Sequence, residues 1–415
     1  MDIRILDGKW GDSIMPIQRF LEKHNASAEA VSAPECLAQL LREMELGLGG
    51  TGNIPMIPSY LSLDIRPVFG EPCCVMDAGG TNLRIARAVF SPDGTCQLED
   101  LQKIPMPGTT GELSSGDFYG TLAALAQGTG AEARIGLCFS YNVLLDRDLD
   151  GILDSWCKEV QIPDAPGKPV GASLRQAIGR RCQHICVLND SVAALLGGHS
   201  RHSEVSLGLI LGTGINICYR EQNRNIPKLP SDIRSDSMII STEIGEFDGF
   251  PKSTFEEAVI LSSDEPTMAH GEKQCAGAYL GKIISLAWQE ASREGLIPEA
   301  FSRSVPLPEI SDYLAGTNFQ LPDDPGAREI AAATIRRGAK IAAILTAGAV
   351  LKSDCGKHCT MIIEGSQYRK LTGFGTCFDE ELANILSPYG ITVSIRQTEN
   401  SCLLGAALAA FAMPM

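Results

Sequence analysis

Two short glycine-rich turns, each enclosed by apolar and β-branched residues, constrain the fold of this chain more than any other feature. The first turn is GGTN, which follows an apolar run ending at Asp77 within residues 73–90. The second is GTG, within residues 207–219. An apolar run, a tight turn and a second apolar run predict two β-hairpins. Because Thr81 and Thr213 hold the same place in the two turns, we predict two related halves.

Turns of this composition can hold phosphate groups. Glycine lets the backbone approach a ligand without a Cβ between them, and turn N–H groups with a threonine hydroxyl can surround phosphate oxygens. Asp77 is placed to order a Mg²⁺ ion through water, because Mg²⁺ keeps much of its hydration shell. An ordinary core hairpin explains either turn alone, whereas two turns with the same chemistry favour a nucleotide held between the halves.

Segments of strand and helix character alternate through the rest of the chain. Helical patterns cover residues 14–24, 33–46, 170–179, 272–291 and 326–351, and strand patterns cover residues 133–140, 184–188, 360–363 and 393–396. This alternation predicts an α/β protein with mixed sheets flanked by helices. The sequence contains neither a Walker A motif nor G-x-G-x-x-G, so P-loop and dinucleotide-binding folds are not supported.

Charge and hydrophobicity exclude some classes of partner. The net charge of −15 and the pI near 4.9 argue against nucleic acid or an anionic membrane, which would call for a basic face. The first residues lack the pattern of a signal peptide, and the apolar segment 402–415 is shorter than a membrane-spanning helix. We therefore expect a cytoplasmic protein with no nucleic-acid or membrane partner.

The 14 cysteines favour buried, reduced thiols over a disulfide scaffold. Two C-x3-C pairs, at 182–186 and 355–359, each enclose a histidine, so zinc sites have to be considered. Neither pair has a clear second pair of ligands nearby. Structural thiols are the favoured interpretation.

Asp190 is the candidate catalytic base. It follows the apolar strand 184–188 and precedes a helical pattern, a place from which a carboxylate can accept the proton of a substrate hydroxyl during phosphoryl transfer. Asn-Asp-Ser before an apolar helix is also a common N-cap sequence. On this motif alone, both interpretations stay open.

Nine motifs in order resemble the hexokinase/glucokinase family of the actin-like sugar-kinase superfamily. They are DAGGTNLRI, GLCFSYN, WCK, LNDSVAALL, LGTGINICY, STEIGEF, EKQCAGAYLG, EGS and GAAL, and they span nearly the whole chain. The resemblance implies two actin-like (ribonuclease H-like) domains with mixed sheets around a central cleft. It also implies ATP-dependent phosphorylation of a hexose, glucose to glucose 6-phosphate by default, with ATP and Mg²⁺.

The resemblance also assigns site residues. Asp190 matches the catalytic base, and Asp77 is the residue that would reach Mg²⁺ through water, with no direct metal ligand. The positions around the sugar are matched by Ser140, Cys157, Lys158, Asn189, Asp190, Asn216, Glu243 and Glu272. The ATP and phosphate positions are matched by Asp77, Gly79, Gly80, Thr81, Asn82, Arg84, Gly212, Thr213, Gly214, Gly365 and Ser366. Such a ring of donors and acceptors discriminates sugars, because a missing hydroxyl leaves buried polar groups unpaired.

Two domains follow from the resemblance and from ordinary domain sizes. We expect a small domain of residues 68–188 plus 403–415 and a large domain of residues 1–67 plus 189–402. The sequence leaves the oligomeric state open.

Several residues depart from the family pattern. Cys157 replaces Thr, Asn142 replaces Pro, Ile244 replaces Trp, Glu246 replaces Ala and Glu364 replaces Asp. These changes leave sugar preference and the adenosine contacts open. Three alternatives therefore remain: a related kinase for a different or modified sugar, a non-catalytic sugar sensor, and an actin-like ATPase module that binds proteins.

Overall fold

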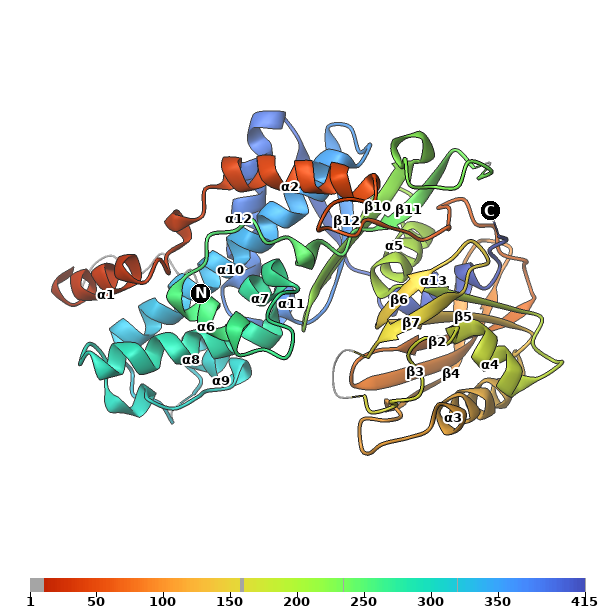
Figure 1. The fold of residues 1–415 in the computed structure, drawn as a ribbon, viewed down its shortest axis with the longest axis horizontal. Coiled ribbons are helices and arrows are strands. Elements are labelled where there is room, and N and C mark those ends of the chain that lie inside the picture. The colour runs from red at the N-terminus through yellow and green to blue at the C-terminus, as the bar shows by residue number, and fades with distance from the viewer. Residues whose placement is uncertain (1–10, 157–159, 234, 319, 415) are drawn as a thin grey trace.

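Two mixed β-sheets flanked by helices form the molecule (Figure 1). The computed structural model describes residues 11–156, 160–233, 235–318 and 320–414. The predicted α/β class is confirmed.

The first sheet has the strand order β4-β3-β2-β5-β8. Its strands are β2 (Pro72–Ala78), β3 (Asn82–Phe90), β4 (Cys96–Pro105), β5 (Arg134–Phe139) and β8 (His184–Leu188). The first three form an antiparallel meander, and β5 and β8 continue the sheet in parallel with β2. β2 and β3 are the hairpin predicted for residues 73–90, with Asp77 opposite Arg84.

The second sheet has the order β1-β11-β10-β9-β12-β13. Its strands are β1 (Ile57–Pro58), β9 (Val205–Leu211), β10 (Ile215–Gln222), β11 (Ser237–Ser241), β12 (His358–Glu364) and β13 (Thr392–Arg396). β9, β10 and β11 form an antiparallel meander, and β12 and β13 continue in parallel with β9. The two sheets thus share one arrangement of five strands, as the repeated turn predicted. β6 (Asn142–Leu145) and β7 (Gly151–Ser155) form a separate hairpin.

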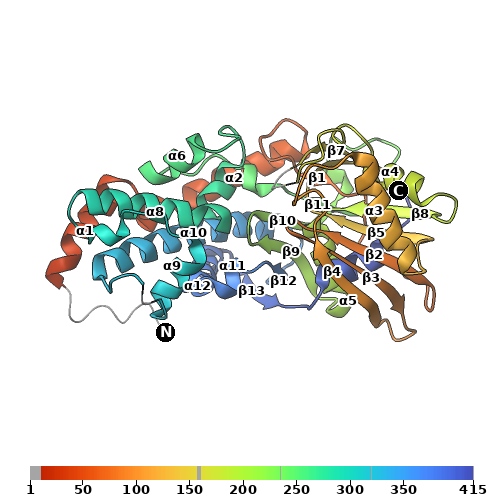
Figure 2. The same ribbon diagram turned by 90° about the horizontal axis from the view of Figure 1, so that it is seen from below.

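Helices cover both sheets and form a large body beside the second one (Figures 1 and 2). They are α1 (Gly11–Lys23), α2 (Ala33–Leu48), α3 (Ser115–Gly128), α4 (Val170–Ile178), α5 (Asp190–Arg201), α6 (Thr254–Leu261), α7 (His270–Cys275), α8 (Gly277–Arg293), α9 (Leu307–Ala315), α10 (Pro325–Lys352), α11 (Gln367–Lys370), α12 (Phe374–Leu386) and α13 (Ser401–Ala409). Among the residues described, no helix is both long and apolar enough to span a bilayer.

The prediction of one helix over residues 272–291 is wrong. Ala276 has an extended backbone (φ −83°, ψ 156°) and separates α7 from α8. The break lets Gly277 N donate to Gly212 O (2.8 Å). In a continuous helix this N–H would bond to the carbonyl four residues earlier, so contact with the second glycine turn overrides helix propensity.

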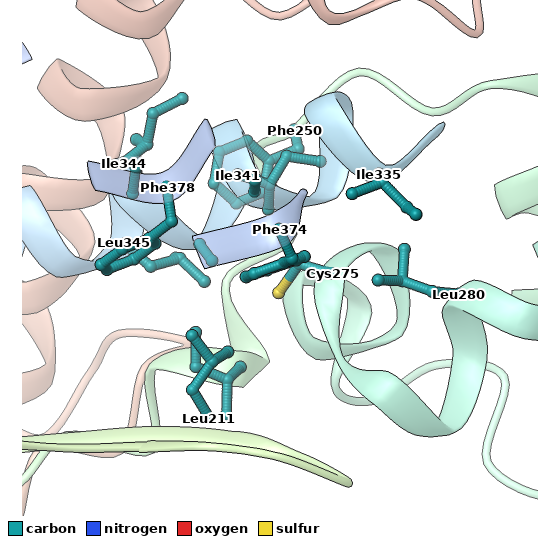
Figure 3. Packing of buried hydrophobic residues seen from close by; sticks show 14 of the residues in the cluster. Leu211, Phe250, Cys275, Leu280, Ile335, Ile341, Ile344, Leu345, Phe374 and Phe378 are labelled. Carbon is teal, nitrogen blue, oxygen red and sulfur yellow. The ribbon is translucent and has the colours of Figure 1, made fainter. Parts of the chain in front are cut away.

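α10 is the central helix of the large helical body. It is buried along most of its 28 residues, which explains its composition of alanine and isoleucine. Figure 3 shows Ile341 and Ile344 of α10 beside Phe374 and Phe378 of α12, with Leu211 of β9 below them. The same hydrophobic core therefore supports the second glycine turn, which follows Leu211.

α5 and α13 join the two sheets. One hydrophobic core contains both helices together with Val75 of the first sheet and Ile239 of the second. α13 also approaches β5 closely, because a Cβ built on Gly136 would lie 1.8 Å from Ala406 O. The domain boundaries named above remain a prediction, since α13 packs against elements of both halves.

Small residues let α5 and α13 come into backbone contact. A Cβ at Gly197 of α5 would lie 2.0 Å from Ser401 O, and one at Gly405 of α13 would lie 1.9 Å from Ala193 O. No side chain fits at such distances, so any larger residue at these positions would force the two helices apart.

The two thiols of the cysteine motif at 182–186 do not lie together. Cys186 belongs to the core around α5 and α13, whereas Cys182 belongs to the core on the other face of the first sheet. The two thiols therefore point into separate hydrophobic clusters.

We predict that Gly405→Ala lowers the free energy of unfolding by about 1–3 kcal/mol, the usual cost of overpacking a core. This loss outweighs the better helix propensity of alanine, about 1 kcal/mol. The matched control is Gly120→Ala in α3, where the new Cβ meets nothing within 4 Å, and which we expect to be neutral or stabilising. Urea unfolding of both variants measures the difference, and equal stabilities would contradict the packing argument.

Candidate active site

The first glycine turn, residues 79–81, is exposed at the end of a buried hairpin. Gly79 N donates to Asn82 O (3.1 Å), and Tyr141 Oη donates to Gly79 O (2.8 Å). β2 is buried along most of its length, whereas Thr81 is exposed. The strands thus fix a turn in which Gly79 and Gly80 are partly exposed and Thr81 is exposed.

The second glycine turn lies against the start of α8. Gly277 N donates to Gly212 O (2.8 Å), and Ala278 N donates to Thr213 O (3.2 Å). Thr213 is exposed and Gly214 is partly exposed. The second turn therefore repeats the arrangement of the first, with the threonine at the surface.

Gly365 and Ser366 lie beside the second turn. Gly365 has a φ of +112°, and a Cβ there would lie 2.2 Å from Leu211 O. A Cβ built on Gly212 would lie 3.5 Å from Gly365 Cα. Glycine is thus required at 365 both by its backbone conformation and by this close approach.

Polar contacts connect the first turn to the start of α13. Arg84 Nε donates to Asp77 Oδ2 (2.8 Å), and its Nη2 contacts the same oxygen. Arg84 Nη1 donates to Asn400 Oδ1 (3.3 Å), and the Ser401 hydroxyl bonds to Glu364. The Glu364 carboxylate, which replaces the usual Asp, therefore holds the end of β12 to α13.

Asp190 is the first residue of α5, but Asn189 is the N-cap. Asn189 Oδ1 accepts from Ser191 N (2.8 Å) and from Ser191 Oγ (2.7 Å). Asp190 Oδ1 also accepts from Ser191 N (2.9 Å). Because Asn189 already satisfies the cap, the Asp190 carboxylate is not required for it.

Asn216 is the centre of a hydrogen-bonded cluster next to Asn189. Its Nδ2 donates to Glu243 Oε1 (2.6 Å), to Ser241 Oγ (3.0 Å) and, more weakly, to Asn189 Oδ1 (3.4 Å). Its Oδ1 accepts from Glu243 N (3.0 Å). The structure thus brings three of the predicted sugar-site residues, from β10, the end of β11 and the start of α5, into direct contact.

Glu243 combines an unusual backbone with an unusual charge environment. Its φ is +53°, a left-handed conformation that is uncommon outside glycine and is found at functional sites. Burial raises the pKa of Glu243 to about 7, and the Asp190 and Glu272 carboxylates act in the same direction. The hydrogen bonds from Ser241 and Asn216 oppose this shift. Three carboxylates therefore share one small region.

Glu272 links the second turn to this cluster. Its Oε2 accepts from Ile215 N (3.0 Å), and a Cβ at Gly214 would lie 2.3 Å from the same oxygen. Glu246 Oε2 accepts from Ala269 N (2.8 Å), at the N-cap of α7, which carries Glu272. Glu246, which replaces the alanine of the family pattern, thus holds the helix that carries Glu272.

Ser140 and Asn142 lie between β5 and β7 in the chain. Ser140 follows β5, is partly exposed, and bonds through its backbone N–H to β2 (3.1 Å). Asn142, which replaces a proline, donates from Nδ2 to Ser155 Oγ (3.0 Å) and so ties β6 to β7. Cys157 and Lys158 lie outside the described residues.

Two serines that lie within the motifs but were assigned no role, Ser191 and Ser241, belong to this region. Ser241 Oγ donates to Glu243 Oε1 (3.0 Å) and lies 3.4 Å from Ser191 Oγ. Ser241 ends β11 and stands two residues before Glu243 in the same motif, so its closeness in sequence could have indicated it. These hydroxyls hold the amide and carboxylate groups in place.

We predict that Glu243→Gln becomes more stable relative to the natural protein as the pH rises from about 5 to 8. The native pKa of about 7 lies above the ordinary value of 4.5, so the native state binds more protons than the unfolded state between these values. Ionisation then lowers the free energy of unfolding as the pH rises. The glutamine variant lacks this loss, which we expect to be about 1–3 kcal/mol.

Urea unfolding at several pH values measures this difference. Glu35→Gln, at an exposed position on α2, makes the same chemical change away from the cluster and serves as the control. If the stabilities of Glu243→Gln and the natural protein change in parallel with pH, burial does not raise the pKa of Glu243.

The chain is similar to known proteins along nearly all of its length. Two family models described as Hexokinase match residues 16–200 and 206–412. Hexokinase-7 of Oryza sativa subsp. japonica is 28% identical over 428 residues, which cover 90% of this chain and 92% of that protein. Hexokinase-1 of the same organism is 33% identical over 281 residues, 61% of this chain and 56% of that protein.

Solved structures share the fold. A hexokinase from Schistosoma mansoni complexed with glucose has a TM-score of 0.81 at 20% identity, covering 97% of this chain and 100% of that one. The structure and the family matches agree, so the chain belongs to the hexokinase family of enzymes, which phosphorylate hexoses with ATP.

Proposed function

We propose that this chain phosphorylates glucose to glucose 6-phosphate, with Asp190 as the catalytic base. The observation that carries the proposal is the cluster of Asn189, Asn216 and Glu243 beside Asp190. Hydrogen-bond donors and acceptors for several hydroxyls converge there with a carboxylate that the helix cap does not need. The glucose complex of the schistosome hexokinase makes glucose the first substrate to consider.

Hydrogen-bond acceptors and donors both hold the sugar. Glu243 and Glu272 accept from sugar hydroxyls, whereas Asn189, Asn216 and Lys158 donate. Ser140 and Cys157 match two further sugar positions of the family. The contacts of Asn216 with Glu243 orient both side chains before the sugar binds. Preorganised donors and acceptors reject sugars whose hydroxyls do not match, because the protein groups would be left unpaired.

The triphosphate binds at the two turns. Residues 79–82 with Arg84 form one side, and Gly212, Thr213 and Gly214 with Gly365 and Ser366 form the other. The residues fit such a ligand, since both threonines are exposed and glycine backbone borders both turns. Arg84 bonds to Oδ2 of Asp77, and Asp77 would hold Mg²⁺ through water. When bound, Mg²⁺ neutralises charge on the phosphates.

Asp190 accepts the proton of the sugar hydroxyl as the hydroxyl oxygen attacks the terminal phosphorus. The bond between that phosphorus and ADP breaks, and the proton remains on the carboxylate until solvent removes it. Positioning and charge stabilisation supply most of the catalysis in phosphoryl transfer. Closure of the small domain, residues 68–188 with 403–415, over the large domain would exclude water from this reaction.

A different hexose is the second candidate. Ile244 is fully buried next to Glu243, where the family has Trp, and Glu246 fixes α7 through a contact that alanine cannot make. Both changes adjoin sugar-site carboxylates. They support a sugar preference other than glucose with the same reaction.

We predict that Asp190→Asn lowers kcat by about 10²–10⁴-fold, the usual contribution of a general base, and leaves sugar binding within a few-fold. Asparagine is as good a helix cap as aspartate, so a merely structural Asp190 would tolerate this change. ADP release measures turnover, and intrinsic tryptophan fluorescence measures sugar binding.

The matched control is Asp324→Asn. Asp324 caps α10 by accepting from Ala327 N (2.8 Å) and lies far from the site in sequence. We expect Asp324→Asn to keep full turnover. Normal turnover in Asp190→Asn would show that Asp190 is not the catalytic base. If the natural protein binds sugar but shows no turnover, the non-catalytic sugar sensor is favoured instead.

A further inference from the structure

The His24 side chain is fixed where α1, α6 and α8 meet. Its ring packs against Phe20 of α1 and Phe255 of α6, with centroid distances of 4.7 and 4.8 Å, and the two phenyl rings also stack on each other (5.8 Å). Its carbonyl oxygen accepts from Thr254 N (3.1 Å). Aromatic packing thus positions the imidazole, and the backbone bond ties the end of α1 to the start of α6.

The imidazole nitrogen Nε2 of His24 is buried and unsatisfied. The side chain is 9% exposed, and Nε2 has no hydrogen-bond partner among the residues that the structure describes. A buried polar atom without a partner costs free energy. Nε2 points to Glu294, with 3.8 Å to Oε1, a distance too long for a hydrogen bond.

Two carboxylates of α8 face this nitrogen. Glu290 and Glu294 are four residues apart, so they lie on one face of the helix. One ligand atom from each glutamate and one from His24 all lie within 4.8 Å of one another. Within the described parts of the chain, this is the one group of three such residues with that geometry.

We propose that His24, Glu290 and Glu294 bind a divalent transition-metal ion, Zn²⁺ by preference, which clamps the end of α1 to α8. Zn²⁺ takes imidazole nitrogen and carboxylate oxygen at about 2.0–2.2 Å and completes its coordination with water. Ca²⁺ and Mg²⁺ prefer oxygen ligands alone. The imidazole therefore selects a transition metal.

Two cations compete with the metal for the carboxylates. Lys23 Nζ lies 2.5 Å from Glu294 Oε1, and Arg293 Nε donates to Glu290 Oε2 (2.8 Å). The Lys23 and Arg293 side chains are 59% and 72% exposed. Exposed ion pairs contribute little to stability, so a metal ion that also satisfies His24 can displace both.

The bound metal would stabilise the folded protein, whether or not the proposed reaction is correct. An ion that binds the native state alone raises the melting temperature. It would hold α1 and α8 together through three protein ligands from two segments far apart in sequence.

The test uses the full chain, freed of metal with a chelator and then titrated with Co²⁺ and with Zn²⁺. We expect one equivalent of Co²⁺ to give weak visible d–d bands without a thiolate charge-transfer band. Zn²⁺ should raise Tm by a few degrees. Glu294→Gln and His24→Gln should weaken binding about tenfold or more, and Lys23→Met, which removes a competitor, should tighten binding.

The matched control is His358→Gln, which changes an exposed histidine within the sequence motif of Cys355 and Cys359 and should leave binding unchanged. A thiolate band, the absence of any Zn²⁺ effect on Tm, or equal affinity in Glu294→Gln and the natural protein would overturn the site. His24 is buried, so its variant could unfold. Glu294 is exposed, and its variant tests the ligand set without disturbing the core.

Discussion

The backbone contact between α5 and α13 is the constraint on which the rest of the structure depends. Each helix follows the last strand of its sheet, β8 for α5 and β13 for α13, so they occupy equivalent places in the two halves. Gly197 and Gly405 let the helices meet without side chains between them. This contact also brings their first residues together, because Cys402 Sγ contacts Asp190 O (3.8 Å).

The crossing of these helices therefore builds the candidate site from both halves. The start of α5 carries Asn189 and Asp190, next to the amide and carboxylate groups of the second sheet. The start of α13 carries Asn400, which bonds to Arg84 of the first hairpin. A sugar beside α5 and a triphosphate at the two turns would meet where the helices begin.

Much of this arrangement could be predicted from local sequence. Both hairpins follow from apolar runs around glycine turns, and the place of Asp190 between a strand and a helix follows from the apolar pattern on either side. Ser241 could have been found from its spacing to Glu243. The break at Ala276 could not, because it depends on a bond between Gly277 and a turn 65 positions earlier in the chain. The contact of Arg84 with Asn400 likewise joins residues that no local pattern relates.

The most direct test of the account is the coupled release of ADP and sugar phosphate from Mg-ATP with glucose, mannose, fructose, glucosamine and N-acetylglucosamine. We expect one ADP for each hexose phosphate formed, with glucose the best substrate. ADP release that no sugar accelerates would contradict the assignment of this site to hexose phosphorylation.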